Sequence, residues 1–391
     1  MATKILKSAA AVYLMICLFT TVSYAQSLGL PTSRYGICFG NSKNFTGLRF
    51  NIVDKDVEEI KGINFTAWRS EENKDARVTG LSIGLGSPAA GYMTGIQLGG
   101  AVMADRELKG ISLGLLGAGA GDKCQGITIG GLAAGAGDEA RGITMGLLAA
   151  GAGDRASGIM VGGLAAGTGD EFTGFAASFL ASGAGDRARG ILIGGLAAGA
   201  GDDVKGILIG GLAAGAGDNL TGFSCSLLAS GAGDSAKGIT IGGLFAGAGD
   251  TMSGFSCSFL AAGAGDMLEG ITLSGLVAGA GDTARGITIG GIAAGAGDSV
   301  RGLTIGGIAA GSRDISGITF ALGTVQAVKD GSMTGFAASA FNQIKGSQHG
   351  ISVGVVNSAY ELNGVQIGVI NYVRDNPPYA RVLPLINAHF D

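Results

Sequence analysis

Apolar, small and polar residues follow one another along most of the chain with a constant period of 16 residues. A representative unit at residues 126–141 reads GITIGGLAAGAGDEAR. With its first glycine as position 1, positions 2 and 4 are mostly Ile, Leu, Val or Phe, and position 3 is often Thr or Ser. Position 7 is Leu or Ile, positions 8 to 12 are nearly all Ala and Gly, and position 13 is Asp. Alternation at positions 2 to 4 predicts a short β-strand with one buried face.

The glycine at position 1 marks the extent of the array. It recurs every 16 residues from Gly110 to Gly302. Looser intervals extend the series to Gly47, Gly62, Gly80 and Gly95 upstream and to Gly317, Gly335, Gly350 and Gly364 downstream. We therefore expect a glycine-rich repeat domain at residues 47–371, an N-terminal cap at 26–46 and a C-terminal cap at 372–391. One unit buries little apolar surface alone, so stability should come from stacking.

The pattern predicts an all-β fold, a single-chain β-solenoid of about 18 short, mostly 16-residue coils with terminal caps. We expect positions 2, 4, 7 and 15 to point inward, with Ala and Gly letting the opposite wall approach closely. The alternative is an antiparallel outer-membrane β-barrel, a pore or anchor whose strands would need about 9–11 residues each. The same Gly-Asp turn at every junction favours the solenoid, because such barrels pair short turns with long loops.

Three units, beginning at Gly174, Gly222 and Gly254, depart from the pattern together. Position 4 shrinks from Ile to Ala or Cys, while position 6 grows from Gly to Phe or Leu. This exchange conserves volume, which suggests that both side chains enter one close-packed interior.

The first 25 residues have the layout of a secretory signal peptide. Lys4 and Lys7 precede an uncharged, mostly apolar run at residues 9–22, and small residues follow at Ser23 and Ala25. Cleavage is expected before Gln26. An uncleaved membrane anchor is the alternative, although the run is short for a spanning helix.

Composition excludes several classes of protein. Of 391 residues 77 are glycine, 47% are hydrophobic and only 14% are charged, which does not fit a disordered chain. The net charge of −4 provides no basic footprint for nucleic acid. Cys38, Cys124, Cys225 and Cys257 are expected to be small buried apolar side chains. Cys225 and Cys257 lie two repeats apart, about 10 Å if units stack at strand spacing, which is too far for a disulfide.

The aspartates at position 13 form the most regular polar series. Stacked at about 4.8 Å, their carboxylates would repel one another. We expect them to cap turns by accepting backbone N–H bonds. Calcium binding, as in a β-roll, is a minor alternative, because each unit lacks a second acidic ligand. The series comprises Asp122, Asp138, Asp154, Asp170, Asp186, Asp202, Asp218, Asp234, Asp250, Asp266, Asp282, Asp298 and Asp314.

Other candidate chemistry is sparse, and we assign no catalytic, cofactor-binding or metal-binding residue. His349 and His389 lie far apart in the sequence without metal-ligand spacing, so both are expected to be ordinary surface or cap residues. Neither a nucleophile elbow nor a phosphate-binding loop is present, so we expect neither an enzyme nor a cofactor. A flat hydroxyl ladder of the kind that ice-binding solenoids use is a remote alternative, formed by Thr128, Thr144, Thr240, Thr288 and Thr304.

The last repeats resemble a known family. Residues 350–357 (GISVGVVN) and 364–371 (GVQIGVIN), followed by RVLPLIN at 381–387, are similar to bacterial surface-repeat proteins with Gly-Val-Gln-Ile-Gly units. The central units depart from that pattern by carrying Ala or Gly where the family has Asn. The resemblance implies export and surface or outer-membrane association, with no assigned activity. We therefore expect an exported structural or interaction protein at the cell surface or outer membrane, otherwise secreted or periplasmic, with surface components as partners.

Overall fold

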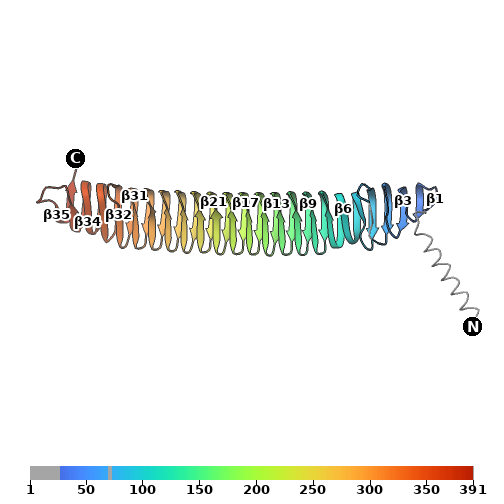
Figure 1. Ribbon diagram of the computed structural model, residues 1–391. Coiled ribbons are helices and arrows are strands. Elements are labelled where there is room, and N and C mark those ends of the chain that lie inside the picture. Colours follow the sequence, from blue (N-terminus) through green and yellow to red (C-terminus); the bar gives the residue numbers. More distant parts are fainter. Residues whose placement is uncertain (1–26, 69–72, 391) are drawn as a thin grey trace, which may run out of the picture. The chain divides into compact units, whose positions relative to one another are not determined.

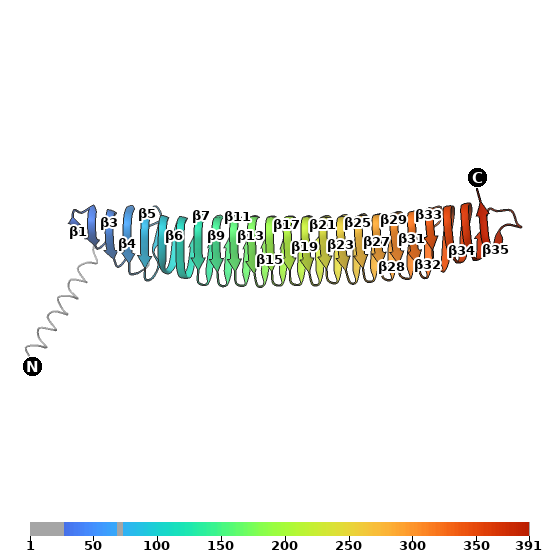
Figure 2. The ribbon, with the colours of Figure 1, turned by 180° about the vertical axis from the view of Figure 1, so that it is seen from behind.

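The computed structural model describes residues 27–68 and 73–390, so the predicted signal peptide at 1–25 lies outside the described residues. The chain is all-β, with no helix in its described part. It divides into two compact units, unit 1 at residues 1–179 and unit 2 at residues 180–391. Both are β-solenoids, with about 19 coils in all (Figure 1 and Figure 2). The described residues contain no helix with the length and apolar character needed to span a membrane.

Each central coil has two strands of unequal length and two corners. In one coil the long strand is β9 (Glu139–Gly146) and the short strand is β10 (Ala149–Ala152). Positions 6 and 7 turn the chain from the long to the short strand, and we call this turn the leucine corner. Positions 12 and 13 lead to the next coil and form the aspartate corner.

Unit 1 begins with short strands and continues into regular coils. The irregular strands are β1 (Leu28–Pro31), β2 (Tyr35–Phe39), β3 (Asn44–Asn51), β4 (Glu59–Thr66), β5 (Arg77–Gly84) and β6 (Ala89–Ala120). The long strands are β7 (Lys123–Gly130), β9, β11 (Arg155–Gly162) and β13 (Glu171–Ser178). The short strands are β8 (Ala133–Ala136), β10 and β12 (Ala165–Thr168).

Unit 2 repeats the same alternation. The short strands are β14 (Ala181–Ala184), β16 (Ala197–Ala200), β18 (Ala213–Ala216), β20 (Ala229–Ala232), β22 (Phe245–Ala248), β24 (Ala261–Ala264), β26 (Val277–Ala280), β28 (Ala293–Ala296), β30 (Ala309–Ser312) and β32 (Thr324–Ala327). The long strands are β15 (Arg187–Gly194), β17 (Asp203–Gly210), β19 (Asn219–Ser226), β21 (Ser235–Gly242), β23 (Thr251–Ser258), β25 (Met267–Ser274), β27 (Thr283–Gly290), β29 (Ser299–Gly306), β31 (Asp314–Ala321) and β33 (Ser332–Ala338). It ends with β34 (Phe341–Val373) and β35 (Val382–His389).

Consecutive coils pair in parallel and in register. Long strands pair with long strands, as Ile207 of β17 pairs with Phe223 of β19, and short strands pair with short strands. The predicted solenoid is therefore confirmed, and the alternative of an antiparallel barrel is wrong. Among the pairings of the described residues, antiparallel ones occur where β1 meets β2 and where β34 meets β35. Pro31 and Pro384 lie in these two terminal strands, where a missing N–H limits further pairing.

The glycine at position 1 is required by the backbone. These glycines have positive φ in coil after coil, for example +110° at Gly254. A Cβ atom at Gly254 would lie 2.2 Å from the carbonyl oxygen of Gly238 in the preceding coil. Only glycine tolerates both the conformation and the close approach.

The interior is lined differently from the prediction. Position 15 points inward as expected, since Val204 is buried. Positions 2, 4 and 7 were predicted to be inward and instead point outward. In β17, Leu208 at position 3 is fully buried, whereas Ile207 and Ile209 are 38% and 37% exposed. Strict alternation along the strand from position 15 places the side chains of positions 3 and 5 inside, and this leaves positions 2 and 4 outside.

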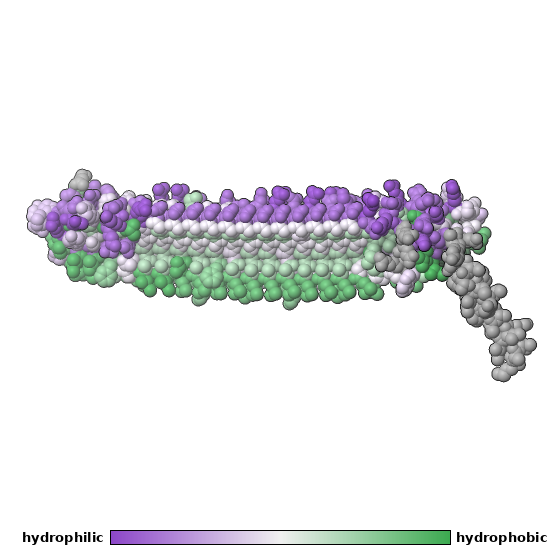
Figure 3. Space-filling view, in the orientation of Figure 1, coloured by the Kyte–Doolittle hydropathy of each residue, from purple (hydrophilic) through white to green (hydrophobic). Residues whose placement is uncertain are grey.

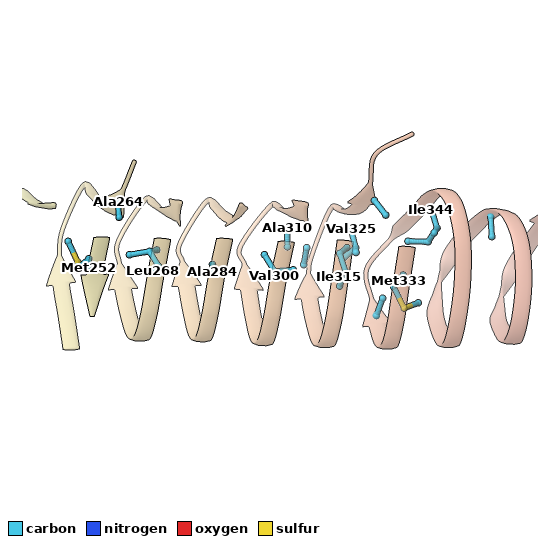
Figure 4. Packing of buried hydrophobic residues seen from close by; sticks show 14 of the residues in the cluster. Met252, Ala264, Leu268, Ala284, Val300, Ala310, Ile315, Val325, Met333 and Ile344 are labelled. Atoms are coloured by element: carbon cyan, nitrogen blue, oxygen red, sulfur yellow. The ribbon is translucent and has the colours of Figure 1, made fainter. Parts of the chain in front are cut away.

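The space between the two strands of a coil is narrow. In unit 2 a row of position-15 side chains, among them Met252, Leu268 and Val300, packs against Ala264 and Ala310 of the short strands (Figure 4). Small inward residues on the short strand allow the two walls to approach each other. Larger side chains at positions 2 and 4 are accommodated outside.

We predict that Gly254→Ala destabilises the protein by about 2 kcal/mol or more, because alanine at positive φ would also collide with the Gly238 carbonyl. The matched control is Gly247→Ala in the preceding coil, where an added Cβ would make an ordinary 3.4 Å contact. We expect the control to change stability by less than about 1 kcal/mol. Thermal unfolding followed by circular dichroism measures both, and equal effects would contradict this account of position 1.

Candidate functional site

The main surface feature is an apolar band along one side of each unit. Outward side chains at positions 2, 4, 6, 7 and 8 form it, and we call this band the apolar edge. Figure 3 shows apolar residues gathered along one side and polar residues along the other. In unit 1 its well-exposed members include Ile111, Leu115, Leu116, Leu132, Met145, Leu147, Leu148, Ile159, Leu164 and Phe179. In unit 2 they include Leu196, Ile207, Ile209, Leu212, Leu227, Leu228, Ile239, Phe245, Phe259, Ile271, Val277, Ile292, Ile308, Ile318, Phe320 and Leu322.

The backbone of the leucine corner is saturated with hydrogen bonds. The amides of Gly163, Leu164 and Ala165 donate to carbonyls of the preceding coil at 3.0, 2.8 and 3.0 Å. The same pattern recurs at Leu212 and Ala213. These corner amides therefore need no partner from outside, and the edge presents mainly its side chains.

The three unusual units alter this edge, and they also place serine at the inward position 5, where Ser226 and Ser258 are buried. Phe179, Leu227 and Phe259 at position 6 are 71%, 65% and 63% exposed. Cys225 and Cys257 at position 4 are half-buried on the same outer side. The exchange is present, but the prediction that it occurs inside the solenoid is wrong, because positions 4 and 6 both face outward.

The cysteines divide into two groups. Cys38 and Cys124 are buried as predicted, and burial raises the pKa of the Cys124 thiol. Cys225 and Cys257 are free, and each pairs in register with Ile241 of the coil between them. The prediction that they form no disulfide is confirmed, whereas the prediction that they are buried is not.

The aspartate corner differs from the expected cap. The amides of Asp154 and Arg155 both donate to the main-chain carbonyl of Asp138 at 2.9 Å, and this pattern repeats from coil to coil. The carboxylates are therefore not needed to satisfy these amides. Within the described part of the chain, only two carboxylates of the row have partners: Asp298 pairs with Arg313, and Asp314 accepts from Ser332.

Carboxylates lie close to one another in the middle of this row. The pKa of Asp218 is raised above its ordinary value by partial desolvation and by the carboxylates of Asp234, Asp202 and Asp203. Its own coil carries neither Lys nor Arg to offset them. In residues 27–68 and 73–390, no cluster of three or more His, Cys, Asp or Glu side chains is placed to hold a metal ion.

We predict that Asp218→Asn raises the thermal midpoint at pH 7 and low salt. Because the pKa of Asp218 is raised in the folded state, the ionised carboxylate destabilises the fold. This penalty is absent at pH values below the unfolded pKa of 3.8 and is complete above the folded pKa. The gain should therefore shrink as the pH falls toward 3, and it should also shrink in 1 M salt through screening. A variant that melts below the parent protein at pH 7 would contradict the repulsion.

A buried polar cluster lies inside the first coils. Arg49 is fully buried, contacts the Asp54 carboxylate, and donates to Asn64 at 3.0 Å and Asn41 at 2.8 Å. Asp54 also accepts from Thr66 at 2.7 Å. Burial alone would raise the pKa of Asp54, but the Arg49 charge and the hydrogen bonds lower it below its ordinary value. The Arg49 and Asp54 side chains are buried, and the hydrogen bonds of the cluster join neighbouring coils.

We predict that Asp54→Asn destabilises the protein by about 3 kcal/mol, because it leaves the Arg49 charge buried without its counter-ion. The stability that Asp54 contributes is present above pH 3.8 and is lost as the pH falls through its lowered folded value. The exposed neighbour Asp56 provides the control, since Asn readily adopts its positive φ of 51°. Denaturant unfolding of Asp54→Asn and Asp56→Asn at pH 7 should separate them, and similar midpoints would refute the role of the pair.

A second polar network runs through the last coils. Asn342 donates to Asn357 and Asn357 to Asn371, each at 2.7 Å, and Gln366 donates to Gln348 at 3.0 Å. The Asn and Gln of the GVQIGVIN unit therefore form ladders in the interior. In the sequence, these ladders are indicated by Asn or Gln at positions where the central units carry Thr or Ala.

The hydroxyl ladder also lies inside. Thr128, Thr144, Thr240, Thr288 and Thr304 are all at most 4% exposed. Position 3 shares the inward direction of position 15, so this row cannot form an outer hydroxyl face. The ice-binding alternative is therefore wrong.

The structure brings the two histidines to one place. His349 and His389 line a common hollow of about 290 Å³ together with Glu361 and Asp375. The two histidines are far apart in the sequence but meet in the structure because β35 folds back antiparallel onto the last coil. There His389 pairs with Gly364. Sequence spacing alone could not reveal this, since it depends on where the C-terminal strand docks.

Comparisons of the chain with protein-family models, curated proteins and solved structures give no match.

Proposed function

We propose that this chain is an exported structural and interaction repeat protein of the bacterial cell surface or outer membrane, acting by binding and not by catalysis. The apolar edge of each unit is the observation that carries the proposal. Outward Ile, Leu and Phe side chains follow one another there coil after coil, as Leu212, Leu228 and Phe245 do. Contiguous apolar surface beyond about 300–600 Å² marks interaction sites on soluble proteins.

The distribution of polar groups supports a binding role. Arg49 and Asp54 are enclosed in the interior, where their hydrogen bonds join neighbouring coils. An open hollow of about 500 Å³ in unit 2 is lined mostly by Ala and Gly of the short strands, such as Ala294 and Gly295. A repetitive exterior of this kind suits contact along its length.

The proposal that the protein is exported is based on its sequence. The basic start, apolar run and small residues before Gln26 are typical of a cleaved signal peptide. The resemblance of residues 350–357 and 364–371 to bacterial surface-repeat proteins supports the same destination. The partners proposed on this basis are components of the outer membrane or cell surface.

Cell fractionation with N-terminal sequencing tests the proposal. We expect the protein in the envelope or at the surface, accessible to added protease in intact cells, with Gln26 as its first residue. A variant lacking residues 2–25 is the control and should stay in the cytoplasm. Recovery of the unaltered protein from the cytoplasm with its first 25 residues intact would refute export.

A further inference from the structure

The apolar edge of unit 2 is large enough to form a stable protein interface. Its members at position 2, such as Ile207, Ile239 and Ile271, are each about two-fifths exposed, and those at position 6 are exposed further. At roughly 70 Å² for each half-exposed side chain, the rows named above amount to more than ~1,000 Å². A stable dimer buries about 800 Å² on each partner.

Charges are kept away from this surface. In the coils that begin at Gly190 through Gly302, every Asp, Glu, Lys and Arg occupies positions 12 to 16, around the aspartate corner. Figure 3 shows the resulting polar band on the side opposite the apolar edge. A partner can therefore cover the apolar edge without burying an unpaired charge, which would be strongly unfavourable.

In the coils of unit 2 that begin at Gly222 and Gly254, the large apolar side chain of the edge moves from position 4 to position 6. Where position 4 shrinks to Cys257, position 6 grows to Phe259. The Phe259 ring leans over the next coil, where a Cβ on Gly275 would lie 3.3 Å from its Cδ2 atom. The exchange keeps a large apolar side chain on the edge in these coils, against which the fixed side chains of a protein partner can pack. A fluid lipid phase would not require any particular arrangement of these side chains.

The period of the apolar edge favours a second copy of the chain as its partner. Its ridges repeat once per coil, at the strand spacing of about 4.8 Å. A second copy of the chain presents ridges with the same period and the same absence of charge. A two-fold interface brings one patch against itself, so residue rows can interdigitate along its whole length.

We infer that the apolar edge of unit 2 docks a second copy of this chain, with the two edges packed face to face. The inference deepens the proposed structural role by naming its partner. Self-association is measured on the purified protein, so its outcome is independent of where the cell places the chain.

Sedimentation equilibrium of the full chain tests the inference. We expect the mass of two chains for the unaltered protein. The triple variant Ile207→Thr, Ile239→Thr and Ile271→Thr keeps β-branched residues on β17, β21 and β25, and should weaken dimerisation at least ~100-fold. The matched control places threonine at position 16 of the same strands, through Lys205→Thr, Lys237→Thr and Glu269→Thr, and should remain dimeric. Far-UV circular dichroism checks that both variants are folded.

The native thiols provide a second measurement. Cys225 and Cys257 lie on the apolar edge, whereas Cys38 and Cys124 are buried inside the coils. In the dimer the edge thiols should be modified slowly, as read from their peptides by mass spectrometry. The triple variant should expose them and accelerate their modification, while Cys38 and Cys124 remain slow in both proteins.

Three results would overturn the inference. One is a single-chain mass for the unaltered protein at 100 µM. Another is a triple variant that is folded and still dimeric. The third is a single chain that floats with phosphatidylcholine vesicles, which would make a lipid surface the occupant of the edge. Protection of the edge thiols at dimer concentrations, lost in the triple variant, would support a second copy.

Discussion

The narrow gap between the two strands of each coil constrains the rest of the structure. The long and short strands lie close enough that alanines such as Ala264 and Ala310 suffice to fill much of the space opposite Met252 and its equivalents. Stacked parallel ladders supply the backbone hydrogen bonds, and glycine at position 1 permits the approach of one coil to the next. A gap of this width leaves no room for two further rows of large side chains.

The large side chains at positions 2 and 4 therefore lie on the exterior. A globular domain would place its Ile and Leu inside, but here the small interior is filled by Thr, Ser and Ala, with occasional larger residues such as Leu208. The excess apolar side chains line one side and the charged residues the other (Figure 3). The molecule is thus amphipathic across its coil, and its most distinctive chemistry lies on an apolar surface and not in a cleft.

The terminal coils differ from the central ones in having networks of polar side chains in their interiors. The first coils of unit 1 carry Arg49 and Asp54 inside, and the last coils of unit 2 carry Asn357 and Asn371, each in a network that satisfies most of its polar atoms. These networks tie neighbouring coils through directional bonds where the regular packing changes. Polar residues at position 3 of the outer repeats were visible in the sequence, but their inward direction was not.

Periodicity alone predicted an all-β fold, the coil length and the glycine row, and it favoured the solenoid over the barrel because one turn signature recurs at every junction. It also indicated that Val204 and its equivalents at position 15 point inward. Which face of the long strand is inside was decided by the tertiary structure, since one strand runs unbroken from position 14 to position 5 and alternation along it then follows position 15. The same holds for His349 and His389, whose meeting depends on the docking of β35, and for the aspartates, whose amides are satisfied by the neighbouring coil.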